Sequence, residues 1–205
     1  MRINLQNAGK RFNREWVFRR FSYHFIPNHS YAITGNNGSG KSTLLQVIAG
    51  ALMQSEGKIE YKDARSAKDI PGEDAFKEIA IAAPHLDLIE EMSATEFLRF
   101  HATFKPLKAP ESEILTAVGL STASGKQIRY FSSGMKQRLK LAQAFFSNTS
   151  VLLLDEPLTK LDEDGISVYK KLWTEHTEGR LVIVSSNDKQ EYEKCEEVLS
   201  IGDYK

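Results

Sequence analysis

The apolar residues of this chain form two patterns that predict strands. Alternation of apolar and polar residues, which predicts strands with one buried face, occurs at 3–5 and 21–25. Unbroken apolar runs, which predict strands buried on both faces, occur at 151–154 and 181–184. Further short strands are expected at 31–33, 58–61, 78–83 and 197–201.

Apolar residues at helical spacing predict the other elements. From Ser93 to about Phe146 the pattern is mainly helical, and Ser93 with Glu96 has the spacing of a capping box. Breaks in this helical stretch are expected at 106–110 and 121–125. Shorter helices are expected at 44–48, at about 164–177 and at 188–194, and the polar stretch 62–76 is expected to be a loop or a frayed helix.

Strands and helices in alternation predict an α/β fold with a mainly parallel sheet. The helical block at 86–148 interrupts this alternation. We therefore expect one domain in which 1–85 and 149–205 form the core and 86–148 forms an inserted helical subdomain.

Composition narrows the possible chemistry. The 205 residues include 27 Lys and Arg against 27 Asp and Glu, so bulk charge gives no argument for a nucleic-acid partner and none is expected. The single cysteine, Cys195, excludes an intramolecular disulfide and a cysteine-rich metal cluster. The N-terminus lacks the apolar segment of a signal peptide, and no apolar run approaches the length of a spanning helix, so other polypeptides would have to supply any membrane spans.

A glycine-rich segment between a predicted strand and a predicted helix matches the pattern G-x-x-x-x-G-K-[ST]. Glycines let such a loop turn its backbone N–H groups toward phosphate oxygens, and the following helix adds its positive end. Lys41 can reach the β- and γ-phosphates of ATP, and the Ser42 hydroxyl can hold Mg²⁺. The predicted nucleotide-binding residues are Gly35, Asn36, Asn37, Gly38, Ser39, Gly40, Lys41, Ser42 and Thr43.

Two adjacent carboxylates end the most apolar strand. Asp155 and Glu156 follow the run at 151–154, at the strand edge where parallel sheets bind ligands. Asp155 is predicted to hold Mg²⁺ through its water shell. Glu156 is predicted to activate the attacking water as a general base.

With these motifs, the segment 130–138 (YFSSGMKQR) resembles the signature of the ABC ATPase family, usually written L-S-G-G-Q. Ser132 and Gly134 keep the family residues, and Phe131, Ser133 and Met135 depart from them. The resemblance implies a P-loop NTPase fold of the RecA-like type with an N-terminal antiparallel β subdomain. It also implies that Ser132, Ser133 and Gly134 face ATP bound by a second subunit in a head-to-tail dimer.

The resemblance covers nearly the whole chain. Phe12 matches the aromatic residue that stacks on adenine, with Trp16 as the rival candidate, and 161–162 matches the D-loop that links the two sites. The helical subdomain matches the part that docks on integral membrane subunits. The resemblance therefore implies a cytoplasmic protein at the inner face of the membrane, paired with a second copy or a homologous cassette.

Two candidate residues depart from the family pattern. His85 stands where the family usually has a Gln near Mg²⁺ and water, and imidazole nitrogen is a poor ligand for Mg²⁺. Asn187 stands where the family usually has a His; it can donate a hydrogen bond to a γ-phosphate but cannot transfer a proton. Both departures bear on the rate of hydrolysis more than on ATP binding.

The leading interpretation is the ATP-hydrolysing subunit of an ABC transporter. The alternative is a soluble or regulatory ABC-type ATPase with slow turnover that is not coupled to transport. A GTPase is disfavoured because the chain has no Asn-Lys-x-Asp guanine-reading motif.

Overall fold

The computed structural model describes residues 1–204, which form two compact units. The first unit contains residues 1–81, 150–156 and the chain from 179 onward. The second contains residues 82–149 and 157–178. Each unit is described separately below.

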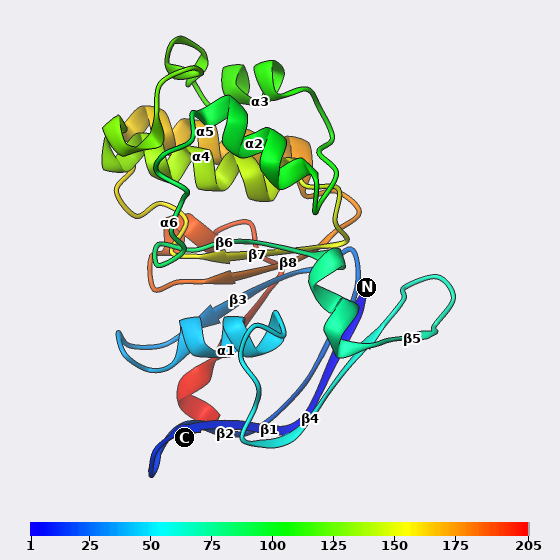
Figure 1. The fold of residues 1–205 in the computed structure, drawn as a ribbon. Coiled ribbons are helices and arrows are strands. Elements are labelled where there is room, and N and C mark those ends of the chain that lie inside the picture. The colour runs from blue at the N-terminus through cyan, green and yellow to red at the C-terminus, as the bar shows by residue number, and fades with distance from the viewer. Residues whose placement is uncertain (205) are drawn as a thin grey trace. The chain divides into compact units, whose positions relative to one another are not determined.

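An antiparallel sheet in the first unit carries the N-terminal strands in the order β2-β1-β4-β5 (Figure 1). Its strands are β1 (Arg2–Phe12), β2 (Glu15–Phe25), β4 (Glu56–Lys62) and β5 (Asp69–Ile70). β1 and β2 are longer than the sequence pattern predicts because β-bulges interrupt their alternation. The bulge residues Asn7 and Arg20 have φ values of 48° and 57°, and the bulge at Arg20 lets Phe18 and Phe21, three residues apart, both face the core.

The second sheet of this unit has the order β6-β7-β8-β3-β9, and the pairs that β3 forms with β8 and β9, and β7 with β8, are parallel. Its strands are β3 (Ser30–Thr34), β6 (Ile79–Ala82), β7 (Val151–Asp155), β8 (Leu181–Ser185) and β9 (Glu197–Ser200). Every residue of β7 and β8 is buried, as their unbroken apolar runs predict. Ser185 pairs with both Ile33 and Asp155, so β3, β7 and β8 end at the same level.

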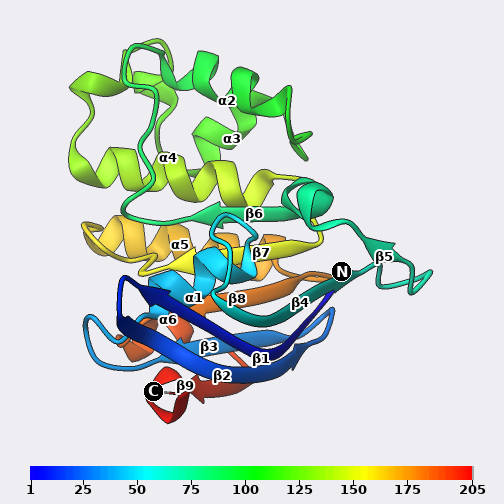
Figure 2. The ribbon, with the colours of Figure 1, turned by 60° about the horizontal axis from the view of Figure 1, so that its bottom comes forward.

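Helix α1 (Lys41–Ile48) lies between the two sheets (Figure 2). Its apolar residues Leu44, Leu45, Val47 and Ile48 are buried in one core with residues of both sheets. The core therefore fixes the start of α1, and with it the glycine-rich segment that precedes the helix.

The expectation of a loop or a frayed helix at 62–76 misses one strand. The short strand β5 pairs with β4, and a 3₁₀ helix, η1, spans Gly72–Glu78. Both elements depend on tertiary contacts, since β5 has only two residues and η1 buries Ala75 alone. Near the C-terminus, helix α6 is short (Lys189–Tyr192), and a second 3₁₀ helix, η4, spans Ile201–Tyr204.

Four α-helices form the second unit: α2 (Ala94–Ala102), α3 (Glu111–Ala117), α4 (Ser133–Phe146) and α5 (Glu163–His176). The capping box at the start of α2 is confirmed: Ser93 Oγ accepts from the Glu96 N–H, and the Glu96 carboxylate accepts from the Ser93 N–H. Short 3₁₀ turns at Ser121–Ala123 and Ile128–Tyr130 separate α3 from α4. The helical stretch is therefore more broken than its apolar spacing predicts.

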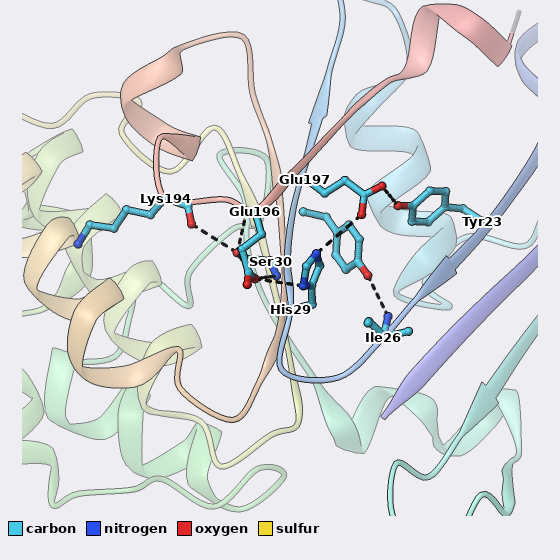
Figure 3. Close-up of polar contacts among 8 residues, drawn as sticks. Tyr23, Ile26, His29, Ser30, Lys194, Glu196 and Glu197 are labelled. Carbon is cyan, nitrogen blue, oxygen red and sulfur yellow. Dashed lines mark hydrogen bonds and ion pairs between the residues drawn. The ribbon is translucent and has the colours of Figure 1, made fainter.

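A polar network fastens the edge strand β9 to the turn before β3 (Figure 3). Glu196 accepts hydrogen bonds from the N–H and Oγ of Ser30 at 2.8 and 3.0 Å, and its carboxylate lies 3.3 Å from His29 Nδ1. Burial raises the pKa of Tyr23, and the hydrogen bond that Tyr23 donates to Glu197 raises it further. The hydrogen bonds from Ser30 hold the pKa of Glu196 below its usual value.

The lowered pKa of Glu196 makes its stabilising effect dependent on pH. Above the usual pKa of 4.5 the contribution is fully present, and it is lost as the pH falls through the lowered folded-state value. We expect Glu196→Gln to reduce the free energy of unfolding at pH 7 by at most about 1 kcal/mol, because the side chain is half-exposed. Urea unfolding at several pH values measures this, with exposed Glu15→Gln as the control. A deficit that persists unchanged at pH 3 would contradict the assignment.

Candidate functional site: the carboxyl ends of the parallel strands

The glycine-rich segment follows β3 and folds around the side chain of the lysine at its own end. Lys41 Nζ donates to the carbonyl oxygens of Gly35 and Asn36 at 2.7 and 3.3 Å, and the Lys41 side chain is buried. The loop therefore encloses a positive charge at the N-terminus of α1, where the helix dipole also favours an anion. Ser42 and Thr43 lie in the first turn of the same helix.

Gly40 shows why this loop requires glycine. Its φ of 102° lies in a region that L side chains rarely adopt, and a Cβ atom there would lie 2.3 Å from Cγ1 of Val17 on β2. The antiparallel sheet therefore packs closely against the start of α1. Only glycine at this position permits both this contact and the backbone conformation of the loop.

Ser39 is a buried polar residue that lacks a partner. The residue is 4% exposed, and its hydroxyl makes no hydrogen bond to any described residue. Such a group costs stability unless a ligand or water satisfies it. A hydroxyl held in this state inside a phosphate-type loop fits an anionic ligand with oxygen acceptors.

Ser185, at the end of β8, holds both predicted carboxylate residues. Its hydroxyl donates to Oδ1 of buried Asp155 at 2.8 Å, and its carbonyl oxygen accepts from the Glu156 N–H at 2.9 Å. Glu156 has a φ of 42°, unusual for a residue other than glycine, so the chain turns sharply after the strand. We did not select Ser185 from the sequence, although a serine directly after an apolar run at a parallel strand end was a usable signal.

Asn187 joins the same site from the loop after β8. Its Oδ1 accepts from the Gly35 N–H at 3.1 Å, and its Nδ2 donates to Asn37 Oδ1 at 3.2 Å. The structure therefore brings the glycine-rich loop, Asp155, Glu156 and Asn187 to one edge of the parallel sheet.

The remaining candidates for phosphate contact belong to the second unit. Ser132 is the N-cap of α4, and its Oγ accepts from the Met135 N–H at 3.2 Å. Ser133 and Gly134 form the first turn, where N–H groups have no acceptor within the helix. A Cβ atom on Gly134 would lie 3.1 Å from the Lys160 carbonyl oxygen, so glycine permits a close approach here.

His85 also belongs to the second unit and is exposed after β6. The backbone that leads to it is held by Lys140 of α4, whose Nζ donates to the carbonyl oxygens of Ala83 and Pro84 at 3.3 and 2.8 Å. Burial lowers the pKa of Lys140, and the nearby charge of Lys160 lowers it further.

The two aromatic candidates for adenine stacking differ in how their rings are covered. Guanidinium groups of Arg19 and Arg11 lie 4.5 and 5.6 Å from the centre of the Trp16 ring. Phe12 is 51% exposed, and Lys10 Nζ lies 5.1 Å from the centre of its ring. Phe12 therefore offers more ring surface to a ligand than Trp16 does.

A cavity of about 620 Å³ lies away from this site. It is lined by residues that precede β3, β7 and β8, among them Asn28, Ser150 and Gly179, so it opens at the opposite ends of the parallel strands. Its size alone does not make it the nucleotide site, because the described residues that line it include none from the glycine-rich loop or from the start of α1.

The donors at the strand ends suit a magnesium–nucleotide complex. The described residues contain no cluster of three or more His, Cys, Asp or Glu side chains that could hold a metal by itself. Mg²⁺ is commonly bound by one or two protein oxygens together with substrate phosphates. The Ser42 hydroxyl and the Asp155 carboxylate fit that requirement, whereas the imidazole of His85 does not.

Comparison with known proteins decides the family. A family model described as "ABC transporter" matches residues 18–159, a range that includes the glycine-rich loop, the segment around Ser132 and the acidic strand end. The chain belongs to the ABC transporter ATP-binding family. It is an ATP-binding ABC ATPase chain, as the motifs predict.

Relatives within the ABC family cover most of the chain. An uncharacterised ABC transporter ATP-binding protein, YybJ of Bacillus subtilis, is 33% identical over 194 residues, 92% of this chain and 87% of the relative. The cytochrome c biogenesis ATP-binding export protein CcmA of Vibrio parahaemolyticus is 30% identical over 176 residues, 83% of this chain and 84% of the relative.

Solved ABC structures share the fold. A putative ABC transporter ATP-binding protein from Pyrococcus furiosus superposes with a TM-score of 0.81 at 23% identity, covering 100% of this chain and 99% of that one. The ATP-binding cassette MJ0796, in a dimeric post-hydrolysis state bound to ADP and Pi, gives a TM-score of 0.81 at 22% identity, covering 97% and 93%. The predicted P-loop NTPase fold with an antiparallel sheet is confirmed.

In the part of the chain that the structure describes, no helix has the length and apolarity needed to cross a bilayer.

Ser39 gives this site a test in which stability and binding change in opposite directions. Ser39→Ala removes a buried hydroxyl without a partner, so the nucleotide-free protein should keep its unfolding free energy or gain up to about 1 kcal/mol. The same change removes a hydroxyl that can donate to phosphate, so ATP affinity should fall roughly tenfold, equivalent to about 1.4 kcal/mol.

Thermal unfolding without nucleotide and calorimetric titration with ATP measure the two effects of Ser39→Ala. The exposed residue Ser121 supplies the control Ser121→Ala. A variant that loses stability and keeps its ATP affinity would show that Ser39 is structural.

Proposed function

We propose that this chain is the ATP-hydrolysing subunit of an ABC transporter, acting as a dimer on separate membrane subunits. The observation that carries the proposal is the common end level of β3, β7 and β8, which gathers the glycine-rich loop, Asp155, Glu156 and Asn187 at one edge. Together these groups supply the parts that phosphoryl transfer to water requires.

Each group has a distinct role in the proposed reaction. Lys41 and the loop N–H groups bind the phosphates of ATP, and Phe12 stacks on adenine. Bound Mg²⁺, held by Ser42 and through its water shell by Asp155, would neutralise charge on the β- and γ-phosphates. Glu156 accepts a proton as a water oxygen attacks the γ-phosphorus and the bond to the ADP oxygen breaks.

Asn187 acts by hydrogen bonding alone. Its amide Nδ2 now donates to Asn37, and the same N–H can instead donate to a γ-phosphate oxygen. Since an amide cannot transfer a proton, Glu156 is the base in this proposal. His85 would contact water or phosphate rather than the metal.

The proposed second subunit supplies the other half of each site. Ser132 and the first N–H groups of α4 form a helix N-terminus suited to a γ-phosphate. The phosphate would come from a second copy or a homologous cassette in a head-to-tail dimer. The dimeric state of MJ0796 bound to ADP and Pi, a protein of the same fold, supports dimer formation.

Transport coupling rests on the relatives. CcmA is named as an export protein, and YybJ as a transporter ATP-binding protein. In the proposal, the helical segment 86–148 docks on membrane subunits at the inner face of the membrane, and 1–85 with 149–205 form the nucleotide-binding core. ATP binding closes the dimer, and hydrolysis and product release reopen it.

The first test replaces the proposed base. Glu156→Gln keeps the shape of the side chain but removes the proton acceptor, so kcat for Mg²⁺-dependent ATP hydrolysis should fall at least about 100-fold while ATP binding remains. Phosphate release and size-exclusion chromatography with and without ATP measure rate and dimerisation. The variant should persist as an ATP-held dimer.

The exposed residue Glu175 provides a matched control, Glu175→Gln, which should hydrolyse ATP normally. A Glu156→Gln protein with the wild-type rate would rule out Glu156 as the base. If neither wild type nor variant hydrolyses ATP although both bind it, the regulatory or partner-activated alternative takes precedence.

A second test concerns the family departure at Asn187. Asn187→Ala removes one hydrogen bond to a charged phosphoryl group, so kcat should fall roughly tenfold to 100-fold with KM for ATP little changed. Steady-state kinetics measure both constants, and Asn148→Ala at an exposed loop serves as the control. An unchanged kcat would mean that Asn187 holds the loop but does not act on ATP.

A further inference from the structure

Helix α4 does more than present the signature residues at its N-terminus. Two polar side chains farther along it, Gln137 and Lys140, donate hydrogen bonds to backbone carbonyl oxygens of distant segments. Both side chains bind backbone carbonyl oxygens, so each contact fixes the backbone position of a distant segment.

The first of these contacts lies next to the proposed base. Gln137 is 4% exposed, and its Nε2 donates to the carbonyl oxygen of Pro157 at 2.9 Å. Pro157 follows Glu156 directly in the sequence, and proline limits the backbone freedom there. A buried carbonyl oxygen without this donor would be unsatisfied, so the contact fixes the chain where it leaves the catalytic carboxylate.

The second contact lies next to His85. Lys140 Nζ binds the carbonyl oxygens of Ala83 and Pro84 together, and a lysine ammonium group has three donors with which to do so. The two carbonyl groups belong to the last two residues before His85. The position of the His85 backbone is therefore tied to the same helix.

The close packing of α4 on the chain after Glu156 is a third, independent link. A Cβ atom on Gly134 would lie 3.1 Å from the Lys160 carbonyl oxygen, so the first turn of the helix lies directly against the segment that Gln137 holds at Pro157. The helix contacts this segment at both its first turn and its second.

We propose that Gln137 and Lys140 are positioning residues, through which helix α4 sets the backbone beside Glu156 and His85 of its own subunit. The inference rests on the proposed function, in which Ser132 at the start of the same helix binds ATP held by the partner. Engagement of the signature in one site is thereby linked to the alignment of the catalytic groups in the other. Neither side chain touches ATP in this scheme.

The test uses Gln137→Met and Lys140→Met, which keep side-chain length but remove the donors. Each should lower kcat for ATP at least about tenfold and change KM for ATP less than about threefold, since the glycine-rich loop is untouched. Lys140→Arg, which restores donors at this position, should recover most of the rate. Gln143→Met on the same helix and exposed Lys126→Met are the matched controls.

Hydrogen–deuterium exchange gives a readout that does not depend on activity. Amides of 85–88 should exchange faster in Lys140→Met, and amides of 158–161 should exchange faster in Gln137→Met. In each variant the exchange of the other of these two segments should be unchanged. If kcat falls and KM for ATP rises together, and both changes follow a lowered melting temperature, the two residues have only structural roles. Unchanged exchange and kinetics would overturn the proposal.

The exchange measurement also separates this inference from the proposed function. If wild-type protein hydrolyses no ATP while the two segments loosen selectively, the proposed function fails and the positioning contacts stand. If wild type is active and neither variant differs from its control, the positioning proposal fails alone.

Discussion

Parallel pairing of β3, β7 and β8 to a common end is the constraint on which the site depends. Because Ser185 pairs with Ile33 on one side and Asp155 on the other, the three chains leave the sheet at the same level. Every residue of β7 and β8 is buried, and a slip of one residue in either pairing would exchange the two faces of the strand, so its side chains would no longer fit the core that packs around them. The hydrophobic core thereby sets the distances between polar groups that make no contribution to it.

The two buried charged groups at this edge each have polar partners within the protein. Lys41 is buried with its ammonium group on two backbone carbonyl oxygens, and Asp155 is buried with a serine hydroxyl donating to it. Each charge is thus solvated by fixed protein dipoles. The site is preorganised for an anion, because the Lys41 ammonium group needs little rearrangement to exchange backbone carbonyl oxygens for phosphate oxygens.

Much of this arrangement could be predicted from the sequence, because local pattern determines it. The unbroken apolar runs predict β7 and β8, and the G-x-x-x-x-G-K-S spacing identifies the loop, since these residue types are needed wherever a backbone encloses phosphate. Bulges at Asn7 and Arg20 and the short strand β5 were not predictable, since pairing with neighbouring strands creates them. The partner of Asp155, Ser185, was missed because serine at a strand end has many ordinary roles.

The helical unit shows why contacts on main chain escape sequence analysis. A glutamine that binds a carbonyl oxygen requires no particular residue at the other end, so no second motif accompanies it. Gln137 and Lys140 lie one turn apart on α4, yet their acceptors, at 157 and at 83–84, are more than 70 residues from each other in the sequence. Only the fold brings these acceptors to one helix. Residues that follow the segment around Ser132 can therefore set the geometry of a neighbouring stretch of chain while taking no part in binding the nucleotide.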